Sequence, residues 1–221
     1  MKVMIKMPTK GRKEKFFSTL DIFYDLCENT KMTYFLITLD NDDEVMNNEE
    51  VRQKLNTYVN LNYTYGESVS KLSATNRDLD NFNDWDILIL ASDDTIPIVK
   101  GYDEIIRNNM IKFFPDTDGV LHFNDGHQKE NLNTCPILGK KYFDRFGYVQ
   151  YPEYKSCFAD NEFMRVSQIL GKSIYFDQVI IEHQHPDWGF GNQDFVHHEN
   201  RINLNHDQSL FQRRQSINFN L

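Results

Sequence analysis

The regular alternation of strand-like and helix-like segments over the first hundred residues constrains the fold most. The strand-like runs lie at 2–7, 32–39, 58–65 and 85–91. The helix-like segments between them lie at 13–27, 44–56 and from Ser68 to Leu79, with Val69 on the apolar side of the third. This order predicts an α/β fold in which helices cover both faces of a mostly parallel central sheet.

Four short loops follow the strands of this predicted sheet. Ligands of such sheets bind beyond the carboxyl ends of the strands. The residues to inspect are therefore those at 8–12, 40–43, 66–71 and 92–95. We expect any small-molecule site to lie among them.

The second half of the chain is less regular. Helices are expected at 102–114, 140–146 and 160–170, and strands at 119–123, 173–176 and 179–182. Phe113 and Ile169 are expected to face inward, and Trp85 to pack in the core. Beyond Asp187 the chain is polar and rich in asparagine, and its sequence leaves open whether this tail is helical or mobile.

Charge and cysteine content exclude several classes of protein. The 24 Lys and Arg residues against 33 Asp and Glu residues leave a net charge of −9, which argues against nucleic-acid and anionic-membrane binding. No apolar run approaches the roughly 20 residues of a transmembrane helix, and residues 1–15 do not resemble a signal peptide. The cysteines, Cys27, Cys135 and Cys157, are odd in number and form no CxxC pair, which predicts reduced thiols in a cytoplasmic protein.

The pair Asp93-Asp94 directly follows the most apolar predicted strand. Adjacent, partly buried carboxylates repel each other, and a divalent cation relieves the repulsion. Oxygen ligands suit Mg²⁺ or Mn²⁺, especially when substrate phosphates complete the coordination shell. The alternative is a solvent-exposed Asx turn or helix cap.

Basic residues gather where the first and third helices are expected to begin. Lys10, Arg12, Lys13 and Lys15 surround the first helix start, and Lys71 follows Ser68 at the third. Cations oppose the positive end of a helix dipole, whereas a bound diphosphate would satisfy both the side chains and the free N–H groups. A solvated surface run is the alternative. No P-loop or GxGxxG motif is present.

Two further groups contain possible ligands or proton acceptors. His183 and His185 follow a predicted strand and lie on one face if that strand continues, so they are candidate metal ligands or simply surface histidines. Asp160 and Glu162 begin a predicted helix, where carboxylates either cap the dipole or serve as a general base.

Taken in order, these segments resemble the GT-A nucleotide-sugar glycosyltransferases, most closely the inverting, family 2-like type, over about residues 2–186. The run Pro8-Thr9-Lys10-Gly11-Arg12 is similar to the opening nucleotide-binding loop. Asp40 resembles the acidic residue that contacts the base or ribose. Lys71 and Asn76 are similar to the segment along the nucleotide and diphosphate.

The remaining motifs resemble the metal and catalytic sites of that family. Asp93-Asp94 resembles the DxD motif, with Ser92 in place of its first aspartate. Asp160 stands at the position of the catalytic base, with Ala159 replacing the usual preceding glutamate. His183 is similar to the metal-binding histidine, and Trp188 is a candidate acceptor or lid contact.

The resemblance implies a GT-A catalytic domain over residues 1–186, with a nucleotide-binding half to about residue 100, an acceptor half, and a polar extension at 187–221. It implies metal-dependent, inverting transfer of a sugar, from a UDP-sugar by default, to a glycan or other hydroxyl acceptor. The cation would be Mn²⁺ or Mg²⁺, held by Asp94, Asp93 and His183. The alternatives are a sugar-phosphate nucleotidyltransferase and a non-catalytic nucleotide- or glycan-binding module.

Overall fold

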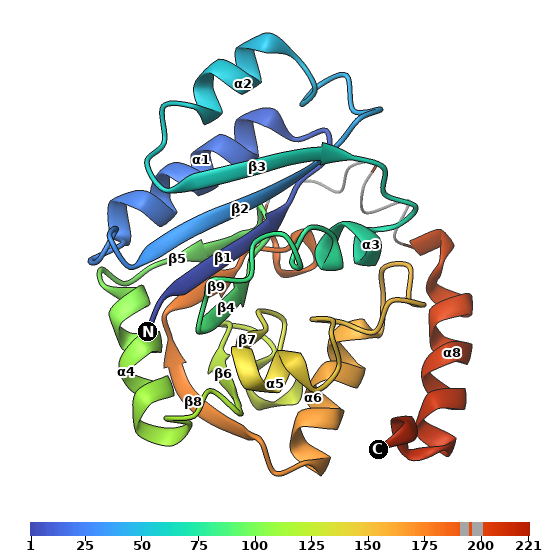
Figure 1. Ribbon diagram of the computed structural model, residues 1–221. Helices are drawn as coiled ribbons and strands as arrows, with labels where there is room; N and C mark the ends of the chain where they lie inside the picture. Colours follow the sequence, from blue (N-terminus) through green and yellow to red (C-terminus); the bar gives the residue numbers. More distant parts are fainter. Residues whose placement is uncertain (191–194, 196–200) are drawn as a thin grey trace.

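A seven-stranded sheet forms the centre of the computed structural model, which describes residues 1–190, 195 and 201–221 (Figure 1). The strand order is β3-β2-β1-β4-β7-β6-β8. The strands are β1 Val3–Pro8, β2 Thr33–Asp40, β3 Leu61–Gly66, β4 Ile87–Leu90, β6 Val120–Asn124, β7 Ile137–Gly139 and β8 Ser173–Val179. All neighbours are parallel except β7, which is antiparallel to both β4 and β6. The mixed, mostly parallel α/β sheet predicted from the sequence is confirmed.

Helices cover both faces of this sheet. On one face lie α1 Lys13–Leu26, α2 Glu49–Leu55 and α4 Tyr102–Phe113, and on the other α3 Lys71–Asn76, α5 Lys140–Asp144 and α6 Ala159–Ile169. The remaining elements are β5 Thr95–Pro97, β9 Ile181–His183, α8 Leu204–Ser216 and the 3₁₀ turns Lys129–Asn131, Pro186–Trp188 and Asn218–Asn220. None of the helices in the described ranges is long and apolar enough to cross a membrane.

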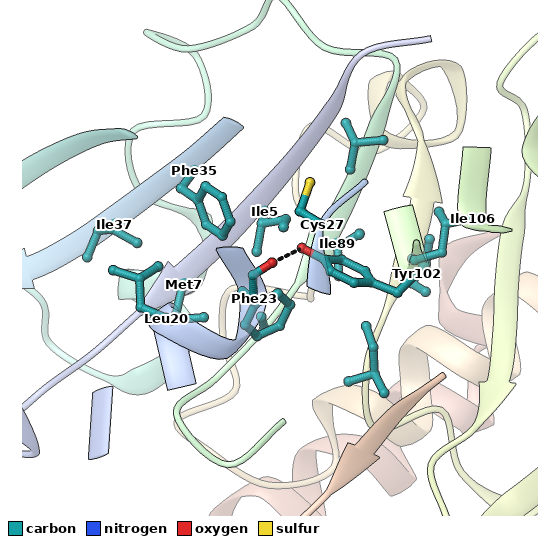
Figure 2. Close-up of a cluster of buried hydrophobic side chains, with 14 of the residues drawn as sticks. Ile5, Met7, Leu20, Phe23, Cys27, Phe35, Ile37, Ile89, Tyr102 and Ile106 are labelled. Atoms are coloured by element: carbon teal, nitrogen blue, oxygen red, sulfur yellow. Dashed lines mark hydrogen bonds between the residues drawn. The ribbon is translucent and has the colours of Figure 1, made fainter. Parts of the chain in front are cut away.

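Alternate residues of β1 supply the two layers of the core. Ile5 and Met7 face α1 and pack with Leu20 and Phe23, as Figure 2 shows, whereas Met4 faces the opposite layer. The Tyr102 hydroxyl donates a hydrogen bond to the Phe23 carbonyl at 3.1 Å, which satisfies a polar atom inside this layer. Each large apolar side chain buried here contributes about 1.5–3 kcal/mol, so the sheet is a firm base for the loops at its edge.

Several predicted boundaries were wrong for local reasons. Ser70, and not Ser68, caps α3, because Ser70 and Ser73 exchange side-chain hydrogen bonds in a capping box. Val69 therefore precedes the helix and is 84% exposed. The second helix begins at Glu49 after the Asn48 cap, and not at residue 44. Phe113 and Ile169 are exposed near the ends of their helices, and not inward.

The short strands were missed, whereas the packing of Trp85 was predicted correctly. β5 and β7 have three residues each, too few for a recognisable period. Trp85 is buried against Phe143, with ring centroids 5.3 Å apart. The three cysteines are free thiols.

Lys6 is fully buried at the centre of β1. Its ammonium donates hydrogen bonds to the Thr38 hydroxyl and, at 2.7 Å, to the Arg77 carbonyl. Burial lowers the pKa of Lys6 to about 7, although the Asp78 carboxylate raises it in part. The folded chain therefore releases this proton far below the ordinary pKa of 10.5, at which the unfolded chain releases it.

This difference predicts a stability that rises with pH, because the unfolded state binds more protons between the two pKa values. We expect the free energy of unfolding of the wild type, relative to Lys6→Met, to rise by about 3 kcal/mol between about pH 7 and pH 9.5. Urea unfolding at a series of pH values measures it. Lys2→Met, at a partly exposed lysine beside the same strand, is the control and should leave the slope unchanged. Parallel wild-type and Lys6→Met curves would contradict the assignment.

Candidate functional site

The carboxyl ends of β1, β2 and β4 open into a cavity of about 950 Å³, which we call the strand-end cavity. Most of the residues predicted from the sequence line it: Pro8, Thr9, Lys10, Arg12, Asp40, Lys71, Asp93, Asp94, Asp160, His183 and His185. The loops before α1 and α3 and after β4 meet there, as a parallel sheet requires. Asp160 and the two histidines reach the same cavity from the second half of the chain.

Three predicted site residues do not line the strand-end cavity. The side-chain amide of Asn76 donates to the Gln150 carbonyl at 2.7 Å, and its oxygen accepts from the Val149 N–H at 2.9 Å. Glu162 is buried in an ion pair with Arg214 at 2.7 Å. Trp188 stacks on His127, with ring centroids 5.3 Å apart. The structure thus gives Asn76 and Glu162 partners within the fold, and gives Trp188 an aromatic partner outside the cavity lining.

The two adjacent aspartates have separate partners. Asp93 faces the start of α1, where the Arg12 guanidinium donates to its Oδ1 at 2.9 Å and the Lys15 ammonium lies 3.7 Å away. The Thr19 hydroxyl donates to the Asp93 carbonyl at 2.8 Å. Burial raises the pKa of Asp93, and the Arg12 charge opposes that rise. Asp93 therefore anchors Arg12 and Lys15 at the start of α1.

Asp94 faces His183 because β5 pairs with β9. The register places Thr95 opposite His183, and the Gln184 N–H donates to the Asp94 carbonyl at 2.7 Å. His183 Nε2 lies 3.7 Å from Asp94 Oδ2. Burial raises the pKa of Asp94, but the nearby His183 imidazole and a hydrogen bond from the Ser92 hydroxyl outweigh burial and hold that pKa well below its usual range. Asp94 is therefore an ionised carboxylate beside an imidazole.

Asp94 and His183 fit a divalent cation that substrate oxygens and water complete. Carboxylate oxygen and imidazole nitrogen are both Mn²⁺ donors, and such ions commonly use one or two carboxylates together with substrate phosphates. Over the ranges that the structure describes, however, no group of three His, Cys, Asp or Glu side chains suits a metal ion. The expected set of Asp93, Asp94 and His183 is therefore not assembled, because Asp93 faces Arg12.

Asp160 enters the cavity from the first turn of α6. The N-cap of this helix, Phe158, has a left-handed backbone conformation with φ 61°. Burial raises the pKa of Asp160, and the Lys71 ammonium partly offsets this effect. The same ammonium lowers the pKa of Asp94, so Lys71 interacts with both carboxylates. A carboxylate with a raised pKa accepts a proton more readily than a solvated one.

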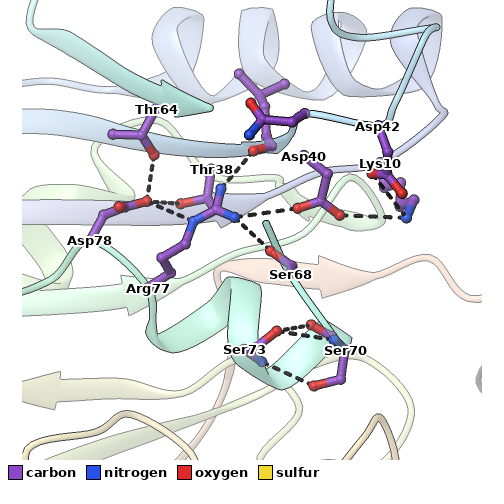
Figure 3. A network of polar contacts seen from close by, with 12 residues as sticks. Lys10, Thr38, Asp40, Asp42, Thr64, Ser68, Ser70, Ser73, Arg77 and Asp78 are labelled. Carbon is purple, nitrogen blue, oxygen red and sulfur yellow. Dashed lines mark hydrogen bonds and ion pairs between the residues drawn. The ribbon is translucent and has the colours of Figure 1, made fainter. Parts of the chain in front are cut away.

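Asp40 belongs to a charged network at the end of β2 (Figure 3). Its carboxylate lies 3.5 Å from both the Lys10 ammonium and the Arg77 guanidinium. Arg77 also donates to the Ser68 hydroxyl at 2.7 Å and to the Leu39 carbonyl at 2.6 Å. One guanidinium thus holds the end of β2 against the loop before α3, and it orients Asp40.

Two hydroxyl groups in the cavity wall are buried without a partner. Thr9 Oγ1 and Thr75 Oγ1 are inaccessible to solvent, and neither has a hydrogen-bond partner among the residues that the structure describes. Thr9 follows β1, and Thr75 lies on α3. A buried hydroxyl that makes no hydrogen bond costs stability, so the fold carries this cost at two positions beside the cavity.

Sequence reasoning missed two residues that shape the first loop and its surroundings. The Asp43 carboxylate accepts a hydrogen bond from the Gly11 N–H at 2.6 Å. Gly11 has φ +68°, which favours glycine. Asp43 lies in an inspected loop, so its position after a strand was the available signal. Arg77 had no such signal, because its partners Leu39 and Asp40 lie on β2, far from it in the chain.

Sequence reasoning also missed two segments in the second half of the chain that form part of the cavity wall. Residues 155–158 line the strand-end cavity directly before α6. Residues 201–204, which lie in the predicted polar extension, line it as well. The extension contains α8, which settles the question left open by the sequence in favour of a helix over Leu204–Ser216.

No protein-family model and no curated protein sequence matches this chain. Among solved structures, the mannosyltransferase PcManGT from Pyrobaculum calidifontis, in complex with GDP-Man and Mn²⁺, is similar with a TM-score of 0.67 and 14% identity, over 86% of this chain and 58% of that one. TarS 1–349 from S. aureus, in complex with UDP-GlcNAc, is similar with a TM-score of 0.66 and 12% identity, over 89% and 60%.

These likenesses identify the fold. The chain has the GT-A fold of nucleotide-sugar glycosyltransferases, as the sequence resemblance implied. It spans about three fifths of the length of these matched chains.

Proposed function

We propose that this protein is a glycosyltransferase that moves a sugar from a UDP-sugar to an acceptor hydroxyl, with inversion at the anomeric carbon and with Mn²⁺ or Mg²⁺. The observation that carries the proposal is the strand-end cavity itself. It joins three cations, Lys10, Arg12 and Lys71, to the Asp94–His183 pair and to Asp160. One cavity therefore contains cations for an anionic donor, a residue pair for a divalent ion, and a carboxylate that can accept a proton.

The donor would bind along the ends of β1 and β2. Lys10 and Arg12 line this part of the cavity and would carry positive charge beside the diphosphate. Asp40, oriented by Arg77, lies where an acidic residue can accept hydrogen bonds from the ribose or base. The charge close to the cavity, and not the net charge of −9 for the whole chain, decides where an anionic donor binds.

Asp94 and His183 would hold the cation. When bound, a divalent ion neutralises the charge that develops on the departing diphosphate. Asp94 is ionised without a metal, because Ser92 and His183 already stabilise its charge. Ser92 stands where the DxD motif has its first aspartate, and here its hydroxyl donates a hydrogen bond to Asp94.

Asp160 would take the proton of the acceptor hydroxyl. It lines the cavity from the α6 side, and its side chain is partly buried. A single displacement needs a base on the acceptor side and charge stabilisation on the donor side. Asp160 and Lys71 can divide these tasks. The residue before Asp160 is the buried Ala159, so no adjacent carboxylate opposes the ionisation of Asp160 from that position.

We also propose that the protein acts in the cytoplasm, which its three free thiols support. The acceptor is proposed only by class, as a glycan or another hydroxyl compound. The domain division at residue 186 is a proposal too, and the contribution of residues 201–204 to the cavity wall makes the extension part of the proposed site.

A thermal-shift screen tests donor and cation binding together. We expect UDP with Mn²⁺ to stabilise the fold by about 2.7 kcal/mol at a concentration of 100 Kd, which raises Tm by about 5–10 °C for a chain of this size. UDP alone should give a smaller shift, and GDP should bind more weakly than UDP. Absence of any shift with UDP, GDP, UDP-GlcNAc or GDP-mannose would contradict the proposal.

Product analysis separates the two alternatives. A transferase releases UDP from a UDP-sugar as the sugar passes to an acceptor hydroxyl or, more slowly, to water, whereas a nucleotidyltransferase releases pyrophosphate from UTP and a sugar 1-phosphate. A binding module shows the thermal shift with neither product. We expect UDP release that depends on Mn²⁺.

A further inference from the structure

Three consecutive backbone N–H groups in the cavity wall converge on one carboxylate from the C-terminal helix. The N–H groups of Lys155, Ser156 and Cys157 donate to Asp207 at 3.0, 2.9 and 2.8 Å. Asp207 lies in the first turn of α8 and is fully buried. Successive N–H groups of this kind form a nest for an anion. Here the chain supplies that anion itself.

A buried ion pair fixes the other end of α8. The Arg214 guanidinium donates to both oxygens of Glu162 on α6, at 2.8 and 2.9 Å from Nε. It also lies over the Tyr151 ring, 3.4 Å from the centroid. Loss of one partner of such a buried pair leaves an uncompensated charge. The helix is therefore held against α6, beside which it runs in Figure 1.

An apolar cluster joins α8 to α3 and to the two ends of the segment 155–158. Leu210 packs with Leu72 of α3 and with Tyr154 and Ala159, which flank residues 155–158. The helix thus packs through Leu210 on the residues that flank the loop and holds the loop backbone through Asp207. The loop ends at Phe158, where φ is 61°, and Asp160 follows two residues later.

We propose that Asp207 is a positioning residue, which holds residues 155–157 as a wall of the strand-end cavity and so fixes Asp160 on the acceptor side. This inference rests on the proposed transfer function. A positive φ at a bulky residue persists only where its surroundings enforce it. Asp207 holds the three residues directly before Phe158, and all three N–H groups lose this acceptor together when its carboxylate is removed.

Hydrogen exchange of the Asp207→Ala variant tests the structural part. We expect the amides of residues 155–157 to exchange at least about tenfold faster than in the wild type, since their hydrogen bonds are lost. Arg213→Ala is the matched control. Arg213 lies on the same helix and pairs with Glu153 at 3.3 Å, but both side chains are exposed. Its removal should leave the 155–157 amides protected.

Kinetics test the positioning role. For Asp207→Ala we expect kcat for UDP release from UDP-GlcNAc to fall about tenfold or more, with the Kd of UDP unchanged within about twofold. The reason is that the three hydrogen bonds lost with Asp207 lie at residues 155–157, whereas the proposed donor-binding residues Lys10 and Asp40 lie at the ends of β1 and β2. Asp207→Asn keeps the shape of the side chain and one acceptor oxygen. Its kcat should therefore lie between those of the wild type and Asp207→Ala.

The outcomes separate this proposal from the transfer function. If the amides of residues 155–157 exchange at the wild-type rate in both Asp207→Ala and Asp207→Asn, the role of Asp207 is overturned, whatever the activity. Faster exchange with an unchanged kcat would overturn the link to Asp160. A wild type without UDP release would contradict the transfer function, while the exchange experiment still decides whether Asp207 holds the loop. If Asp207→Ala does not fold, Asp207→Asn carries the same comparisons.

Discussion

Replacement of Asp94 by alanine is expected to lower UDP release by about 100- to 1000-fold, the range for removing one group that stabilises developing charge. Asp94 is ionised, buried and 3.7 Å from His183. Without it, the imidazole alone remains of the pair that fits a cation. The part of the thermal shift that depends on Mn²⁺ should therefore disappear, whereas the shift caused by UDP alone should remain, because Arg12 and Lys10 are unaltered. Steady-state rates and melting curves measure the two effects.

Asp116→Ala is a suitable control for Asp94→Ala, because Asp116 is an exposed carboxylate paired with Lys141 on the surface. It should leave both the rate and the Mn²⁺ response unchanged. Circular dichroism establishes that Asp94→Ala folds, which matters because the residue is buried. A variant that keeps its full response to Mn²⁺ would contradict the assignment of Asp94 as a cation ligand.

Replacement of Asp160 by asparagine is expected to lower kcat by about 10²- to 10⁴-fold, the usual contribution of a general base. The amide keeps the shape of the side chain and still accepts the hydrogen bond that the Asn161 N–H donates at 2.9 Å. It cannot take a proton from the acceptor. Because burial disfavours the charged form of Asp160, the neutral amide is not expected to destabilise the helix start.

Donor binding distinguishes a lost base from a distorted site. The Kd of UDP for Asp160→Asn should stay within about twofold of the wild-type value, since only the acceptor step needs the carboxylate. Titration calorimetry measures this value on the same preparation used for kinetics. A kcat within tenfold of the wild type would exclude Asp160 as the base.

Much of the candidate site could be predicted because it follows from chain direction. Parallel strands present their carboxyl ends at one edge, so the loops after β1, β2 and β4 must meet there. That rule alone selected Lys10, Asp40 and the Asp93-Asp94 pair for inspection, and all of them line the cavity. The order of motifs along the chain supported the GT-A resemblance, which the structural comparisons confirm as a fold.

Other parts of the site depend on contacts between distant segments. The register of β5 with β9 places His183 beside Asp94, but each strand has only three residues and carries no period of its own. Asp93 pairs with Arg12 and not with the expected metal set, because α1 packs on β5, which follows the aspartate pair. Glu162 was a candidate base from its place in a helix, and its partner, Arg214, lies 52 residues away.

The sequence by itself determined the α/β class, the faces of the main helices and the loops that contain charge, because local periodicity and chain direction dictate these. Only the tertiary structure decided which carboxylate pairs with which cation, and that the C-terminal helix closes the cavity wall through Asp207. Such choices depend on distances between side chains that are far apart in sequence. Burial then changes their energies, since a carboxylate without a partner is costly away from water.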